Sequence, residues 1–133
     1  MTQRHTINPD GLFDSLQYGF SQAMMVEGGR RLLLSGQVGV DENEKTVEGC
    51  IGAQTVKALD NIDYLLKQAG GDLSHVVMLR IYIAEAARDD QRPITEALRR
   101  AFPSNPPPSS WIIVTGLSLP EWLIEIEAEA VLP

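Results

Sequence analysis

The chain has 133 residues, a length that suits one domain and not two. Its formal net charge of −7 disfavours binding to a phosphate backbone, because nucleic-acid-binding proteins usually present a basic face. No apolar run is long enough to cross a bilayer, and the first residues lack the apolar segment of a signal peptide. The single cysteine, Cys50, leaves no partner for an intrachain disulfide. We therefore expect one domain over residues 1–133, located in the cytoplasm, with no nucleic-acid or membrane partner.

Two strands are expected early in the chain, at residues 21–26 and 31–35. Between them lie Gly28 and Gly29, which can adopt positive φ angles, so the sequence predicts a hairpin turn that joins the two strands. Further along, residues 50–69 carry apolar side chains at steps of three and four, which predicts an amphipathic helix. Gly70 and Gly71 then provide a C-terminal stop.

The second half of the chain continues with a predicted strand at residues 76–84 and a helix at residues 90–102, where Pro93 is tolerable only in the first turn. Residues 110–115 are nearly all apolar, which favours a strand buried on both faces. Residues 123–132 alternate between apolar and acidic side chains, so Ile124 should face the core and Glu125 the opposite side.

The resulting order is β-β-α-β-α-β-β, an α+β fold for which the simplest arrangement is a single mixed sheet with both helices on one face. The other face of that sheet would be uncovered, although its strands are too apolar for open water. An exposed apolar sheet face usually marks an oligomer interface, so the pattern also predicts self-association.

Across nearly the whole chain the residues resemble the RidA/YjgF family. The segments that carry the resemblance, in order, are Phe20-Ser21-Gln22-Ala23, Leu34-Ser35-Gly36-Gln37-Val38-Gly39, Gln54-Thr55 with Asn61-Ile62, Pro107-Pro108-Ser109-Ser110 and Leu123-Ile124-Glu125-Ile126-Glu127-Ala128. The resemblance implies a chorismate-mutase-like homotrimer with small-molecule clefts between subunits. It also implies hydrolysis of reactive imines or enamines to a keto acid and ammonia, without a cofactor. An older label of the family is endoribonuclease.

The resemblance assigns the candidate site. Glu125 matches the family carboxylate that positions the attacking water, a role that a carboxylate within hydrogen-bond reach can fill. Glu127 and Glu129 are expected only to line a wet sheet face. The substrate-binding candidates are Phe20, Ser35, Gly36, Thr95, Ser109, Ser110 and Trp111. For Trp111 packing is the main expected role, because a large aromatic side chain usually contributes buried area.

Several of these positions depart from the family pattern. Ser109 stands where deaminating members have an arginine that clamps the substrate carboxylate, and a serine cannot make that two-pronged contact. Phe20 lacks the hydroxyl of the family tyrosine, and Thr95 replaces an asparagine. If a carboxylate is still bound, Arg99 and Arg100 are the first candidates to hold it.

Three functions remain open on the sequence: a RidA-like hydrolase, a non-enzymatic trimeric module that binds a metabolite or a protein, and an endoribonuclease. The last conflicts with the acidic charge and with the lack of a histidine pair. No metal site is expected, since His5 and His75 have no neighbouring cysteine or carboxylate ligands in sequence. Cys50, at the start of a helix, is expected to be an ordinary packed residue.

We predict little deaminase activity on 2-aminoacrylate. Loss of a charge-assisted two-pronged contact should cost roughly 2–5 kcal/mol of binding, or about a thirtyfold to several-thousandfold loss. The assay couples a dehydratase that generates the enamine to detection of keto-acid release. Turnover that equals an arginine-bearing family member would show that another group holds the carboxylate.

Overall fold

A computed structural model describes residues 2–133. Its strands and helices, in chain order, are β1 (Gln3–Ile7), β2 (Ala23–Glu27), β3 (Arg30–Val38), α1 (Ile51–Gln68), β4 (Val76–Ala84), α2 (Arg92–Ala101), β5 (Ser109–Val114) and β6 (Ile124–Leu132). Three short 3-10 turns accompany them: η1 (Leu16–Tyr18), η2 (Leu73–His75) and η3 (Glu85–Ala87). The predicted helices and the last three predicted strands agree with these elements to within about two residues.

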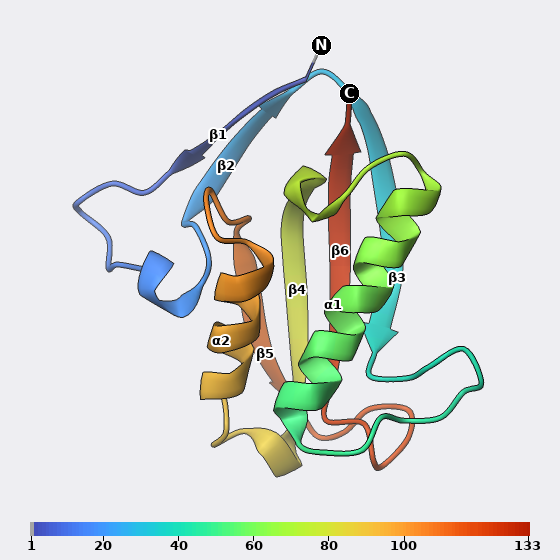
Figure 1. Cartoon of the computed structure of the whole chain (residues 1–133). Helices are drawn as coiled ribbons and strands as arrows, with labels where there is room; N and C mark the ends of the chain where they lie inside the picture. The colour runs from blue at the N-terminus through green and yellow to red at the C-terminus, as the bar shows by residue number, and fades with distance from the viewer. Residues whose placement is uncertain (1) are drawn as a thin grey trace.

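The main sheet has the strand order β3-β6-β4-β5. β6 runs antiparallel to both β3 and β4, whereas β5 runs parallel to β4, so the sheet is mixed. Both α1 and α2 lie over the same face of it (Figure 1). The predicted α+β fold, a mixed sheet with two helices on one face, is confirmed.

Alternating side chains on β6 build the core between the sheet and the helices. Ile124 and Ile126 are both 0% exposed, and they meet apolar side chains from β4, α1 and α2. α1 stops at the predicted place because Gly70, with φ of 86°, takes the left-handed conformation that ends a helix. The NH of Gly71 then donates to the carbonyl of Leu66 at 2.8 Å. Pro93 occupies the first turn of α2, where its missing NH costs nothing.

The predicted hairpin of the first two strands is wrong. β2 pairs with β1 in a separate two-stranded sheet, and β3 pairs with β6 instead. Gly28 and Gly29 do make a tight turn, with φ of 74° and 83°, but the strands on either side of it diverge (Figure 1). At its other end β2 is tied to the segment before β5, because the NH of Ser21 donates to the carbonyl of Pro107 at 3.3 Å.

β1 was missed because its sequence, Gln-Arg-His-Thr-Ile, has almost no apolar signal of its own. We call the pair β1–β2 the N-terminal arm. Arg4 fastens the arm to the main body by donating to the carbonyls of Ser74 at 2.6 Å and Val131 at 2.7 Å. Burial lowers the pKa of this guanidinium, while the nearby Asp72 opposes that shift.

Two predictions about burial also need correction. β5 is not buried on both faces within the chain: it is an edge strand, and Ile112 is 38% exposed. Cys50 is exposed at the start of α1 rather than packed.

The face of the main sheet that points away from the helices is uncovered within residues 2–133, as expected. Its composition is mixed rather than apolar, since it carries Leu33, Met78, Arg80, Tyr82 and Ile112 beside the glutamates of β6. We call this surface the open sheet face.

In the part of the chain that the structure describes, no helix has both the length and the apolar character needed to cross a membrane.

The alternation on β6 can be tested by two neighbouring substitutions. Ile124→Ala should reduce the free energy of unfolding by about 2–5 kcal/mol, because it leaves a cavity in a fully buried site. Glu125→Gln should change it far less, since the side chain lies on the opposite face. Urea denaturation of both variants measures the difference. Equal losses would contradict the register of β6.

Candidate functional site

Glu125 lies against a bulge in the neighbouring strand. β3 pairs with β6 at Leu34 and again at Gln37, with a register shift between these two residues. Ser35 and Gly36 form the bulge, and such irregularities often re-aim side chains at functional sites. A Cβ atom at position 36 would collide with Oε2 of Glu125 and would lie 2.8 Å from its Cδ and Cγ atoms. The space that glycine leaves open is therefore occupied by the Glu125 carboxylate. We call Ser35, Gly36 and Glu125 the β3/β6 half-site.

The other two glutamates of β6 are engaged. Tyr82 donates its hydroxyl to Oε1 of Glu127, and this bond raises the pKa of the tyrosine. Glu129 accepts hydrogen bonds from Arg31 at 2.9 Å and from Arg80 at 3.1 Å, and these bonds lower its pKa. Among residues 2–133 no side chain donates to Glu125. Of the three carboxylates on this face, Glu125 is the one that accepts no side-chain hydrogen bond among residues 2–133, so both of its oxygens can accept one from a water molecule or a substrate.

A second group of predicted residues gathers at the opposite edge of the sheet. The rings of Phe20 and Trp111 lie 6.2 Å apart, in a tilted arrangement. The indole Nε1 of Trp111 donates to Oγ of Ser109 at 3.0 Å. Thr95, on α2, lines the same hollow as Trp111. We call Phe20, Thr95, Ser109 and Trp111 the β5/α2 half-site. The hydroxyl of Ser109 thus has a local partner, because it accepts the hydrogen bond of the Trp111 indole.

The hollow beside the β5/α2 half-site has a volume of about 540 Å³. It is lined by Gln17, Tyr18, Gln91, Arg92, Thr95, Glu96, Arg99 and Trp111. Sequence reasoning named Thr95 and Trp111 and suspected Arg99, but it missed Tyr18 and Arg92. The helical spacing of Arg92, Thr95 and Arg99 was available as a signal, because residues three and four apart share one face of a helix.

Ser110 belongs to neither half-site. Successive side chains of a strand point to opposite faces, so Ser110 faces away from Ser109 and Trp111 and lies exposed on the open sheet face beside Arg80. The prediction that Ser110 lines an intersubunit cleft stays a prediction, because the single chain does not test it.

One chain does not bring the two half-sites together. Ser35 and Gly36 on the edge strand β3 are three strand spacings, or about 14 Å, from β5, and Glu125 on β6 is two spacings, or about 10 Å, from it. The two groups also lie on opposite faces, since Trp111 shares the helix-covered face with Ile81 while Glu125 shares the open sheet face with Tyr82. A cleft that contains both must therefore be formed between chains.

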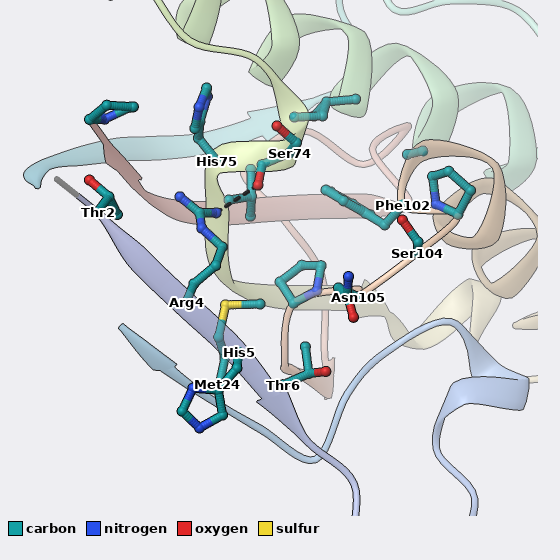
Figure 2. Close-up of a pocket in the computed structure, with 16 residues that line it drawn as sticks. Thr2, Arg4, His5, Thr6, Met24, Ser74, His75, Phe102, Ser104 and Asn105 are labelled. Carbon is teal, nitrogen blue, oxygen red and sulfur yellow. Dashed lines mark hydrogen bonds between the residues drawn. The ribbon is translucent and has the colours of Figure 1, made fainter. Parts of the chain in front are cut away.

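The surface has two further hollows of similar size. One, of about 820 Å³, lies between α1 and the end of β3, and Gly36 is part of its lining. The other, of about 790 Å³, lies under the N-terminal arm (Figure 2). It contains none of the predicted site residues, and the guanidinium of Arg4 within it already donates to backbone carbonyls. We regard the hollow under the arm as structural. Residues 2–133 contain no cluster of three or more potential metal-ligating side chains.

Comparisons with known proteins agree with the fold. A model of the family described as Endoribonuclease L-PSP matches residues 15–132. The 2-iminobutanoate/2-iminopropanoate deaminase of Homo sapiens is 33% identical over 113 residues, which cover 84% of this chain and 79% of the human protein.

Two crystal structures extend the comparison over almost the full length. YyfB of Yersinia pestis, a member of the conserved Rid protein family, is 37% identical with a TM-score of 0.91, and the match covers 97% of this chain and 98% of YyfB. Rv2704 of Mycobacterium tuberculosis, a member of the YjgF/YER057c/UK114 family, is 32% identical with a TM-score of 0.67, covering 98% of this chain and 100% of Rv2704.

Proposed function

The chain belongs to the Endoribonuclease L-PSP family, also called the RidA/YjgF family, and from this premise we propose that it is a deaminase that hydrolyses a small imine or enamine. We place the reaction in clefts between the subunits of a homotrimer. A cytoplasmic location completes the proposal and rests on the single cysteine, which leaves no intrachain disulfide.

The observation that carries the proposal is the unengaged carboxylate of Glu125 against the backbone of Gly36. Hydrolysis adds water to the imine carbon, so a new C–O bond forms before the C–N bond breaks and ammonia leaves. A carboxylate that accepts a hydrogen bond from the attacking water can orient it and take its proton. Glu127 and Glu129 are less suited to this task, because Tyr82 already donates to one oxygen of Glu127 and two arginines donate to the two oxygens of Glu129.

A site between subunits is supported by the separation of the two half-sites within one chain. The open sheet face would give the contact surface, because it combines exposed apolar side chains such as Leu33 and Ile112 with charged pairs. When such a face packs against a second copy, Glu125 of one chain can approach the β5/α2 half-site of the next. The small-molecule cleft is then complete only in the assembly.

A non-enzymatic binding module is the second candidate. Ser109 favours it, because the family's arginine is missing and the serine hydroxyl is used by Trp111. An endoribonuclease has less support, since the net charge of −7 opposes binding of a phosphate backbone.

The catalytic part of the proposal predicts that Glu125→Gln lowers the rate of imine hydrolysis by about 10²–10⁴-fold, the usual effect of removing a general base. Imines generated by an amino-acid oxidase serve as substrates, and released ammonia is measured. Gly36→Ala should have a similar effect, because the added methyl group displaces the Glu125 carboxylate.

Matched controls separate catalysis from folding. Glu127→Gln, two residues further along the same face, should keep the rate near that of the wild type. Gly116→Ala should do the same, since a Cβ there meets no atom within 4 Å. If Glu125→Gln retained full activity, this mechanism would be refuted.

The assembly part predicts a particle of three times the 14.6 kDa chain mass, measured by light scattering on a sizing column. Ile112→Lys, which places a charge on the open sheet face, should shift the protein toward the monomer. Val56→Lys is the control, because Val56 has a similar exposure of 41% but lies on α1. A wild-type monomer at micromolar concentration would contradict the proposed cleft.

A further inference from the structure

The hollow beside the β5/α2 half-site carries an excess of positive charge. Arg92 and Arg99 both line it, and Glu96 is the only carboxylate in the lining. Within residues 2–133 neither guanidinium has an ion-pair partner. Two unpaired guanidiniums that share a concave surface favour an anionic group, and a planar guanidinium matches the geometry of a carboxylate.

Arg99 is exposed, but the start of its side chain packs against the turn at Gly19. A Cβ atom at Gly19 would lie 3.4 Å from Cγ of Arg99 and 3.0 Å from Cβ of Leu98, so the turn at Gly19 packs tightly against α2. Gly19 has φ of 92°, a left-handed conformation that favours glycine. This close contact also brings the neighbouring Tyr18 to the edge of the hollow. Arg100 follows one residue later, about 100° around the helix, and is not part of the lining.

The hollow also replaces what the family positions lack. Phe20 has no hydroxyl, but the hydroxyl-bearing Tyr18 lines the hollow two residues earlier. Ser109 has no guanidinium, but Arg99 presents one from α2, on the same side as Trp111. Tyr18 and Trp111 in addition provide aromatic walls, to which an apolar side chain of a ligand can pack.

We propose that this hollow binds the carboxylate of the substrate, with Arg99 as the main anion-binding residue, and that Tyr18 and Trp111 accept a large apolar side chain. The substrate class is then the imine or enamine of an amino acid with an aromatic or bulky aliphatic side chain. This proposal rests on the proposed deaminase function.

Binding of a stable keto acid tests the proposal directly. Phenylpyruvate and its uncharged analogue phenylacetone are titrated into the full-length protein by isothermal calorimetry. Arg99→Gln should weaken phenylpyruvate binding by about tenfold to a hundredfold, the usual effect of losing a charged hydrogen-bond partner. The adjacent Arg100→Gln should leave the affinity within about twofold of the wild type. Arg99→Lys should recover only part of it, because the charge remains while the planar fork is lost.

The outcomes separate this inference from the proposed function. Equal affinities for phenylpyruvate in the wild type and in Arg99→Gln would overturn the inference, as would phenylacetone binding as tightly as phenylpyruvate or no binding of phenylpyruvate by the wild type. Arg99-dependent binding together with no imine hydrolysis by the wild type would refute the deaminase function and leave the anion site standing. Hydrolysis that depends on Glu125 but not on Arg99 would overturn the anion site at Arg99 and leave the deaminase function standing.

Discussion

The strict alternation along β6 is the constraint on which the rest of the structure depends. β6 pairs with β3 on one side and with β4 on the other, so its register determines which face of each neighbour meets the helices. One face of β6 lies entirely in the core, because its four side chains are at most 2% exposed: Ile124, Ile126, Ala128 and Ala130. Glu125, Glu127 and Glu129 must then share the open sheet face. A slip of one residue would bury three carboxylates and expose the core, and the large cost of burying an unpaired charge forbids it.

The same alternation places three glutamates in one row, and side chains of the neighbouring strands donate hydrogen bonds to two of them. Arg31 and Arg80 flank Glu129, and Tyr82 donates to Glu127. At Glu125 the neighbour is a bulge, and glycine at position 36 leaves room for the carboxylate without a donor from a side chain. The difference between a structural glutamate and a candidate catalytic one thus lies in the adjacent strand, not in β6 itself.

The elements that sequence patterns predicted well are those determined by local periodicity. α1 and β6 carry their own signal, because the core face of each repeats at a fixed spacing along the chain. The pairing of β2 with β1 could not be obtained in this way. Gly28 and Gly29 show that the chain turns, but the partner of each flanking strand is decided by contacts far away, such as those of Arg4 with Ser74 and Val131. β1 has no apolar pattern and exists as a strand only because β2 lies beside it.

The site residues also show this difference between what local periodicity predicts and what long-range contacts decide. Glu125 was assigned correctly to the face opposite Ile124 because alternation is local, and the same alternation places Ser110 on the opposite face from Ser109. Arg99 and Arg100 were both left open, although the four-residue step from Thr95 favours Arg99, because the two arginines lie about 100° apart around α2. The structure decides between them, because Arg99 lines the same hollow as Tyr18 and Arg100 does not, and the turn at Gly19 packs against Leu98 and Arg99.

An arginine at position 109 would change two features of this edge of the sheet. With serine at position 109, the hydroxyl orients Trp111, and Trp111 becomes one wall of the hollow that Arg99 and Tyr18 complete. An arginine at position 109 would lose the bond to Nε1 of Trp111 and would add a third guanidinium beside Arg92 and Arg99, where like charges repel. Ser109 and Trp111 are therefore coupled, and a substitution at either position would alter one wall of the hollow that Arg99 lines.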